Sequence, residues 1–236
     1  MAKKRNLLII PIIIILAIVL ILLKKDYLTI LNVDLFSNEL YNRELAYQIE
    51  TLAVSFIALL ISYLFAPQNC KNFFGKGNLD APVQPAQYFG INPQEDENWL
   101  HIGRNFTVII SLVTAIVIIF QVVNTSQVEF DITMVILVLI FALSNSFVEE
   151  IIFRFTLVVV LFEEVPPDYI YFLSGLIFGV GHYFGVPGGI PGVLMAGFIG
   201  WFLAKSILET KGIFWAWLIH FIQDLIIFWG LFISIL

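Results

Sequence analysis

Long apolar runs, each about the length of a membrane-spanning helix, are the feature that most limits how this chain can fold. A helix needs about 20 mostly apolar residues to cross the hydrocarbon core of a bilayer. We expect about seven such segments, near residues 6–23, 45–65, 106–123, 132–162, 169–184, 190–207 and 213–235. With 60% hydrophobic and 13% charged residues, the chain has too little polar surface to cover a soluble globule. The sequence therefore predicts an all-α, polytopic membrane protein with about seven transmembrane helices.

The charge balance and the cysteine content exclude several other classes. A net charge of -6 argues against nucleic acid as a partner, because phosphate binding needs clustered Lys and Arg. The single cysteine, Cys70, rules out an internal disulfide and a Cys-rich metal site. The lipid bilayer is the first partner that the composition implies.

We divide the chain into two parts of one integrated membrane domain. Residues 1–130 hold N-terminal transmembrane helices and one long polar loop at about 67–104, and residues 131–236 hold a helical core with buried charges. The run at 132–162 is too long for one straight crossing of about 30 Å. We expect it to tilt, kink or run out into the interface near Glu163 and Glu164.

The positive-inside rule predicts the orientation of the chain. If the N-terminus is cytoplasmic and seven spans alternate, eight basic residues lie inside and three lie outside. Those inside are Lys3, Lys4, Arg5, Lys71, Lys76, Arg104, Lys205 and Lys211, and those outside are Lys24, Lys25 and Arg43. We expect a multi-pass integral protein of a prokaryotic cell membrane with a cytoplasmic N-terminus.

Three charged side chains interrupt the apolar run at 132–162: Glu149, Glu150 and Arg154. Each would cost at least about 2.5 to 3.5 kcal/mol in a bilayer if unpaired. Glu150 and Arg154 are four residues apart, so they can form an ion pair along one helix. Glu149 is then the carboxylate without a local partner, and we treat it as the centre of a functional site.

Three further ionisable residues lie in apolar segments: His182, His220 and Asp224. Pro166-Pro167 must break the chain, and Glu149 and His182 are nearly the same number of residues from this turn. In an antiparallel hairpin both would lie roughly 20 to 25 Å from the turn, at one depth. His220 and Asp224 are four apart and share a helix face.

Two more features belong to the same region. Phe178 shares a face with His182, so we expect it to form a wall of the site and contact substrate, while Gly179, Gly181 and Gly185 allow a neighbouring helix or a substrate to come close. For Asn145 and Gln223 the preferred interpretation is hydrogen bonding between helices.

A carboxylate facing histidines in a wet, low-dielectric cavity can activate water for amide hydrolysis. Glu149 would act as general base and His182 would hold or relay the proton. His220 and Asp224 could orient a substrate carbonyl or stabilise its oxyanion. The same four groups, Glu149, His182, His220 and Asp224, could instead bind zinc, which would lower the pKa of a bound water. The residues alone leave this choice open.

Three short motifs occur in order on consecutive apolar segments. They read E-E-I-I-F-R from Glu149, F-G-V-G-H to His182, and H-F-I-Q-D from His220 to Asp224. Together they resemble the CPBP family of intramembrane proteases, which includes CAAX prenyl proteases of the Rce1 type, Abi proteins and bacteriocin-processing enzymes. The resemblance covers roughly residues 132–235, and the N-terminal part has no motif of its own.

The resemblance implies an intramembrane endopeptidase that hydrolyses a peptide bond near the membrane, in a peptide or protein that is lipidated in some members. It makes Glu149 the water-activating glutamate, Glu150 and Arg154 a supporting pair, His182 the partner of the water, and His220 with Asp224 an oxyanion or metal-binding pair. Many members have Asn where this chain has Asp224, and an ionised Asp only accepts hydrogen bonds. The family has been described both as zinc-dependent and as metal-free.

Two functions from other classes are alternatives to an intramembrane endopeptidase. A non-proteolytic membrane scaffold would keep the fold and bind a partner without hydrolysis. A proton-coupled transporter would use Glu149, Glu150 and His182 as a relay. No inverted repeat is evident in the sequence, which ranks the transporter last.

Overall fold

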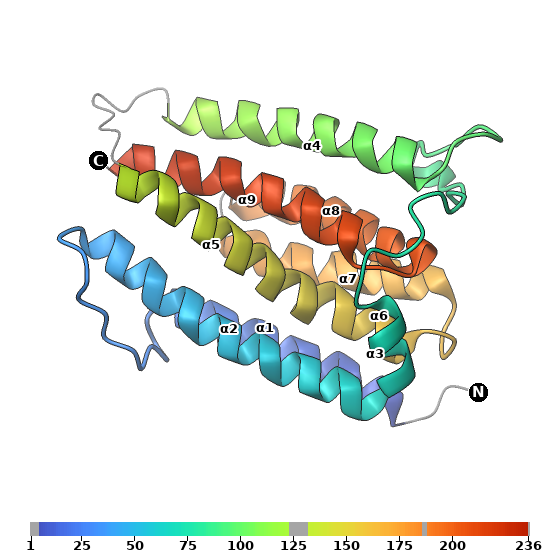
Figure 1. The fold of residues 1–236 in the computed structure, drawn as a ribbon, viewed down its shortest axis with the longest axis horizontal. Coiled ribbons are helices and arrows are strands. Elements are labelled where there is room, and N and C mark those ends of the chain that lie inside the picture. Colours follow the sequence, from blue (N-terminus) through green and yellow to red (C-terminus); the bar gives the residue numbers. More distant parts are fainter. Residues whose placement is uncertain (1–4, 123–131, 186–187, 236) are drawn as a thin grey trace.

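The chain folds into a bundle of long helices. The computed structural model describes residues 5–122, 132–185 and 188–235, and these contain no β-strand. Figure 1 shows how the helices lie side by side, with the two ends of the chain at opposite ends of the bundle. The α-helices are α1 (Ile9–Lys24), α2 (Glu39–Phe65), α3 (Pro67–Phe73), α4 (Trp99–Val122), α5 (Ile132–Glu150), α6 (Thr156–Leu161), α7 (Pro167–Gly181), α8 (Gly189–Thr210) and α9 (Phe214–Ile235).

The predicted all-α membrane fold is confirmed. Six helical segments of the described chain are long and apolar enough to cross a membrane. They lie at Asn6–Lys24, Glu39–Phe65, Trp99–Phe120, Ile132–Leu161, Gly189–Thr210 and Phe214–Ile233. The seventh expected segment is α7, which has 15 residues. At 1.5 Å per residue it is about 22 Å long, so it is shorter than the hydrocarbon core.

Local sequence signals explain where several helices begin. The Asn38 side chain accepts a hydrogen bond from the Leu40 backbone N–H and caps α2. Pro67 and Pro167 occupy the first positions of α3 and α7, where a missing N–H costs nothing. The expected chain break at Pro166-Pro167 is therefore present.

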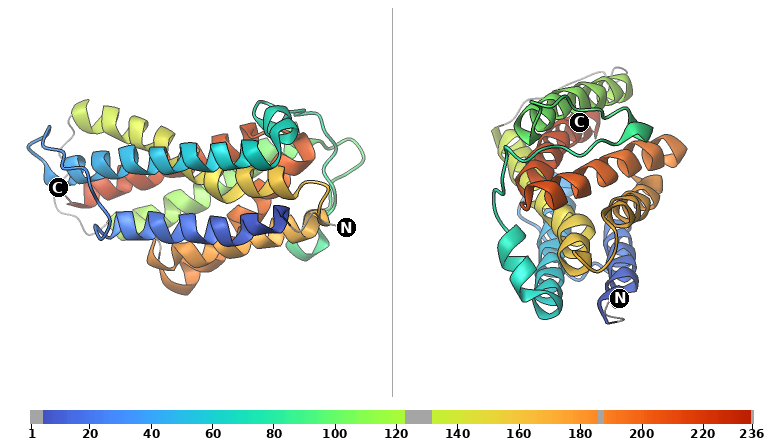
Figure 2. Two further views of the ribbon diagram at one scale, coloured as in Figure 1. Left: turned by 90° about the horizontal axis from the view of Figure 1, so that it is seen from below. Right: turned by 90° about the vertical axis from the view of Figure 1, so that its right-hand side faces the viewer.

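The helices pack in a layered order that places the core. Along one direction the order is α4, α9, α5 and α2, while α7 and α8 pack together at the side (Figures 1 and 2). A larger apolar core surrounds the segment from Ile151 to Leu161, in which every residue is buried. A smaller core joins Tyr41, Phe141 and Phe232 between α2, α5 and α9.

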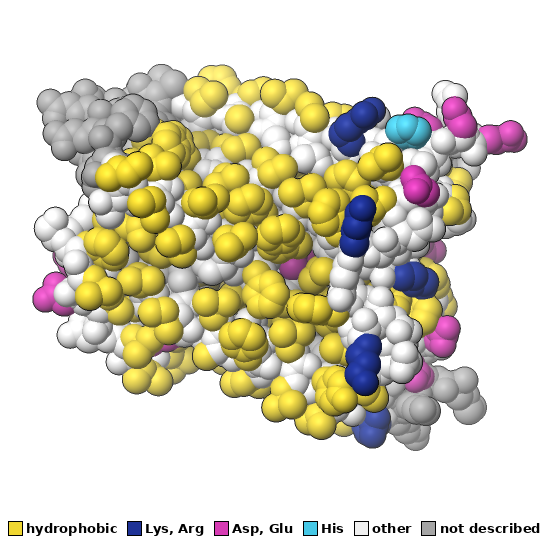
Figure 3. Space-filling model, in the orientation of Figure 1, with side chains coloured by type: hydrophobic (Ala, Val, Ile, Leu, Met, Phe, Trp, Pro, Cys, Tyr) yellow, Lys and Arg dark blue, Asp and Glu magenta, His cyan; other side chains and the backbone are white. Residues whose placement is uncertain are grey.

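The outer faces of the bundle are apolar. Large hydrophobic side chains such as Ile14, Phe56 and Leu112 are more than 40% exposed. Figure 3 shows hydrophobic side chains covering most of one face between the two polar ends. A soluble monomer rarely exposes an apolar patch of this extent, so this surface suits contact with lipid.

Basic side chains gather at the end of the bundle where the chain starts. Figure 3 shows Lys and Arg along this edge of the visible face. Within the described chain this end carries Arg5, Lys71, Lys76, Arg104, Lys205 and Lys211, and the opposite end carries Lys24, Lys25 and Arg43. Lys3 and Lys4, which the orientation rule also counted, lie outside the described residues. The cytoplasmic location of the N-terminus stays a prediction.

The long loop between α3 and α4 folds over the basic end. The Trp99 indole N–H and the Gln84 backbone N–H both donate to Oε2 of Glu209, at 3.0 and 3.1 Å. The other oxygen of Glu209 pairs with Lys205, which is buried. The loop is thereby fixed to the C-terminal end of α8.

Candidate functional site

A π-helical turn follows the two adjacent glutamates. α5 ends at Glu150, residues Ile151–Phe155 form the π turn, and α6 continues in the same direction from Thr156. The Ile151 carbonyl accepts hydrogen bonds from both the backbone N–H and the hydroxyl of Thr156, the latter at 2.7 Å. The expected irregularity in this over-long segment is thus a π turn that follows the glutamates and contains Arg154.

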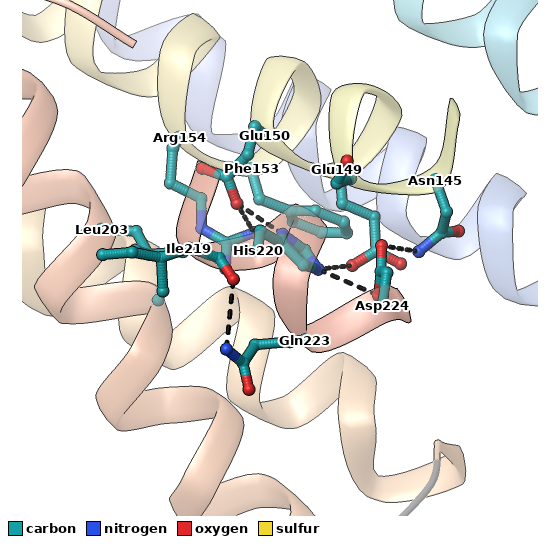
Figure 4. A network of polar contacts seen from close by, with 12 residues as sticks. Asn145, Glu149, Glu150, Phe153, Arg154, Leu203, Ile219, His220, Gln223 and Asp224 are labelled. Carbon is teal, nitrogen blue, oxygen red and sulfur yellow. Dashed lines mark hydrogen bonds and ion pairs between the residues drawn. The ribbon is translucent and has the colours of Figure 1, made fainter. Parts of the chain in front are cut away.

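His220 of α9 lies at the centre of the polar groups, facing three carboxylates (Figure 4). Its Nδ1 is 2.6 Å from Oε1 of Glu150. Its Nε2 is 3.4 Å from Oε2 of Glu149 and 3.6 Å from Oδ1 of Asp224. Because both ring nitrogens face carboxylate oxygens, the imidazolium form, which can donate from both nitrogens, satisfies this site best.

Glu150 and Arg154 form the expected ion pair. Nη1 of Arg154 is 3.2 Å from Oε1 of Glu150, and both side chains are 0% exposed. The guanidinium lies 3.5 Å from the ring centroid of Phe178, a cation–π contact that also shields it. With Oε1 of Glu150 also bound by His220, this carboxylate is held in place from two sides.

Glu149 has a different environment although it is the neighbouring residue. Neither of its carboxylate oxygens takes part in a hydrogen bond within the described chain, and its side chain is 15% exposed. It lines a cavity that Glu150 and Arg154 do not line. The structure therefore leaves Glu149 as the carboxylate that a water or substrate can approach.

His182 reaches the same cavity from the end of α7, as the depth argument predicted. Its Nδ1 is 3.0 Å from the Phe178 carbonyl, which can only accept, so Nδ1 carries a proton. In the neutral ring Nε2 is then an acceptor. No ion pair or hydrogen bond joins His182 to Glu149 among the described residues, so the two face one cavity without touching.

The cavity measures about 360 Å³. Its polar side holds Asn145, Glu149, His182, His220 and Asp224, and the rest of its wall is mainly apolar. Phe178 also lines it, with its ring centroid 4.1 Å from that of His182 and 5.8 Å from that of His220. The expected aromatic wall is present, and substrate contact by Phe178 stays a prediction.

Asn145 and Gln223 join helices, as expected. The Asn145 amide of α5 donates to Oδ2 of Asp224 at 3.0 Å (Figure 4). The Gln223 amide of α9 donates to the Ser111 hydroxyl of α4 at 3.1 Å. The carboxylate of Asp224 is therefore held by Asn145 from one side and faces His220 on the other.

The side chains do not fit the zinc site that was considered from the sequence. Among the residues that the structure describes, no three His, Cys, Asp or Glu side chains are grouped as metal ligands. One oxygen of Asp224 accepts from Asn145, and no hydrogen bond or ion pair brings His182 together with Glu149, His220 or Asp224 among the described residues. A zinc ion bound by Glu149, His182, His220 and Asp224 would need these groups to rearrange, and no reaction step is derived through it.

The sequence reasoning missed one wall of the cavity. Lys24 of α1 and Glu44 and Tyr47 of α2 line it together with Glu149. Lys24 and Glu44 are joined at 2.6 Å, and the Lys24 ammonium lies 4.7 Å from the Tyr47 ring centroid. The sequence feature that could have indicated this wall is the charge of Lys24 and Glu44 at the ends of two spans. Tyr47 gave no such signal, because no motif covers this part of the chain.

A comparison with models of known protein families gives a match in the C-terminal part of the chain. Residues 131–226 match the family model described as type II CAAX prenyl endopeptidase Rce1-like. The match runs from α5 into α9 and includes all six site residues, from Glu149 to Asp224. The resemblance to Rce1-like proteins is thereby confirmed over this segment. Neither the curated proteins nor the solved structures gave a match.

Proposed function

We propose that this protein is an intramembrane endopeptidase that hydrolyses a peptide bond with water activated by Glu149. The observation that carries the proposal is the contrast between two neighbouring carboxylates. Glu150 is bound by His220 and Arg154, whereas Glu149 has no hydrogen bond in the described chain and lines the cavity beside His220. The Rce1-like match supports a protease of the CAAX type.

The first step is attack by water on the substrate carbonyl. A water between Glu149 and His182 donates one hydrogen to the carboxylate and the other to Nε2 of His182. Its oxygen forms a bond to the carbonyl carbon while Glu149 takes up the proton, and the carbonyl oxygen becomes an oxyanion.

The second step breaks the peptide bond. The tetrahedral intermediate collapses, its carbon–nitrogen bond breaks, and Glu149 returns the proton to the leaving nitrogen. One fragment leaves with a new carboxylic acid, which releases its proton to water and becomes a carboxylate, and the other leaves with a new amine. Nε2 of His220, which lies between Glu149 and Asp224, is a donor near the developing charge.

Glu150 and Arg154 act through other groups. Their ion pair is fully buried, and Glu150 orients the imidazole by binding its Nδ1. Asp224 and Asn145 hold the opposite side of the same ring. These are positioning residues, which keep Nε2 of His220 directed at the reaction centre.

The cavity wall indicates the kind of substrate. Residues such as Leu20, Ile118, Ile199 and Phe228 make most of the lining apolar. A membrane-embedded or lipidated peptide segment would bury its apolar surface there at about 25 cal/mol per Å². We therefore propose a peptide or protein substrate that reaches the site from the bilayer, and lipidation of that substrate is part of the proposal.

The test replaces Glu149 by Gln, which keeps the shape and removes the base. We expect cleavage of a membrane reporter peptide to fall at least about 100-fold, the lower range for loss of a general base. Glu95→Gln is the matched control, because Glu95 is exposed on the loop far from the cavity. Wild-type cleavage by Glu149→Gln would overturn the proposal. A cellular phenotype that survives this variant would favour the scaffold, and pH-dependent flux in proteoliposomes would favour the transporter.

Metal dependence is tested on the same assay. The metal-free mechanism predicts that cleavage persists after a zinc chelator and that purified protein carries less than one equivalent of metal. Loss of cleavage with chelator and its return with zinc would show instead that the four groups rearrange around a metal.

A further inference from the structure

The cavity has a wall that lies outside the family-matched segment. This wall comes from α1 and α2, and its aromatic member is Tyr47. Tyr47 lines the same cavity as Glu149, His220 and Asp224. A phenol in this position brings a hydrogen-bond donor to a site that is otherwise built from α5, α7 and α9.

The packing of α2 on α5 places Tyr47 beside the site. Gln48, the next residue, accepts a hydrogen bond from the Ser144 hydroxyl at 2.6 Å. Asn145 follows Ser144 and donates to Asp224. Tyr47 is therefore level with the Asn145–Asp224 pair, and it lines the cavity together with Glu149 and Asp224.

The ring of Tyr47 is in contact with a neighbouring side chain, whereas its hydroxyl is not hydrogen-bonded. The Lys24 ammonium lies 4.7 Å from the ring centroid and is itself bound to Glu44 at 2.6 Å. The Tyr47 hydroxyl, by contrast, has no hydrogen-bond partner within the described chain. A hydroxyl in an apolar cavity costs free energy unless a ligand or water bonds to it, so this group is available to a substrate.

The reaction needs such a donor. The oxyanion is stabilised by donors aimed at the former carbonyl oxygen. Ionised Asp224 can only accept, and the Asn145 amide is already engaged by it. His220 is the one donor assigned so far, and its Nε2 faces two carboxylates.

We propose that the Tyr47 hydroxyl donates a hydrogen bond to the carbonyl oxygen of the scissile peptide and to the oxyanion that forms from it. This rests on the proposed function. No proton is transferred in this contact, since the phenol keeps its hydrogen throughout. The scissile bond then lies between α2 and α5, so the N-terminal part of the chain takes part in catalysis.

The test is Tyr47→Phe, which removes only the hydroxyl. We expect kcat for a membrane reporter peptide to fall about 100-fold, the effect of losing one oxyanion donor, with KM changed less than about threefold. Tyr63→Phe is the matched control, because Tyr63 is on the same helix and exposed on the outer face. Thermal unfolding in detergent should be unchanged in both variants.

A second variant distinguishes the loss of a hydrogen-bond donor from a structural effect of the Tyr47→Phe substitution. Asp224→Asn supplies a new amide donor from α9, so Tyr47→Phe should cost clearly less in the Asp224→Asn background than in the wild type. Additive losses, or wild-type kcat in Tyr47→Phe, would overturn the inference. If Glu149→Gln abolishes cleavage and Tyr47→Phe does not, this inference fails while the proposed function stands.

Discussion

At the scale of single residues, the site shows how two adjacent glutamates are given different tasks. Glu150 points into the protein and is fixed by a guanidinium and an imidazole. Glu149 points into the cavity and has no hydrogen bond among the described residues. Neighbouring helical positions differ by about 100° around the axis, so one carboxylate can be structural while the other faces water.

The buried pair leads to a prediction about stability. Arg154→Met should lower the free energy of unfolding by about 3 to 5 kcal/mol, because it removes the guanidinium that pairs with the buried Glu150 carboxylate and leaves His220 as the facing cation. The double variant Arg154→Met with Glu150→Met should recover part of this loss, since it removes both members of the buried ion pair and replaces them by apolar side chains. Chemical denaturation in detergent measures both.

Glu149→Gln is the control for that experiment. Glu149 is not part of the ion pair, so its variant should unfold within about 1 kcal/mol of the wild type. Equal destabilisation by Arg154→Met and Glu149→Gln would contradict the division of tasks.

Much of the site could be predicted residue by residue. Charges in an apolar run need partners, which led to the Glu150–Arg154 pair, and the count across Pro166-Pro167 brought His182 to the depth of Glu149. The contact between His220 and Glu150 could not be predicted, because helix spacing says nothing about rotation between α5 and α9. Tyr47 was missed because no motif covers α2, and helix spacing does not tell which face of α2 meets α5.

At the scale of elements, α7 and α8 pack unusually closely through glycines. A Cβ on Gly175 would lie 2.6 Å from the Gly197 carbonyl oxygen, and one on Gly179 would lie 2.6 Å from the Val193 carbonyl oxygen. These distances are too short for any side chain, so the backbones touch. The predicted close approach at Gly179 is thus a helix–helix contact beside His182.

Gly179→Val should therefore separate the two helices. We expect a loss of several kcal/mol in stability, from overpacking against backbone that has no room to move. Gly181→Ala is the control, because a Cβ at Gly181 meets nothing within 4 Å. Thermal unfolding of the two variants in the same detergent measures the difference, and equal melting temperatures would contradict this packing.

The π turn was not predictable in kind. The length of the segment at 132–162 required some irregularity, and the structure shows it at Ile151–Phe155. Whether such a segment bends, tilts or inserts a residue depends on packing around it. Here every residue of the turn is buried in the larger core, which holds the wider turn in place.

At the scale of the whole molecule, the two ends of the bundle differ in charge. The end that holds the N-terminus has more exposed Lys and Arg than the end that holds Lys24, Lys25 and Arg43. The positive-inside rule therefore predicts that the first end lies in the cytoplasm. The fold class followed from the apolar runs, whereas the membrane side depends on this charge difference alone.

Labelling with a membrane-impermeant maleimide checks the orientation. In a Cys70→Ser background, Arg43→Cys should react in intact cells, and Lys76→Cys should react only after permeabilisation. Both positions are exposed and lie at opposite ends of the bundle. The reverse pattern would show that the N-terminus is outside.

The position of the cavity has a consequence for substrate entry and product release. The cavity is lined by Lys24, Lys25, Arg43 and Leu231, which belong to the end away from the N-terminus, while buried Phe178 and His220 lie at its inner end. The same mouth must then admit uncut chains and release both fragments. A product fragment that stays bound would delay binding of the next substrate. Affinity for the apolar wall therefore favours substrate binding but also sets an upper limit on the turnover rate.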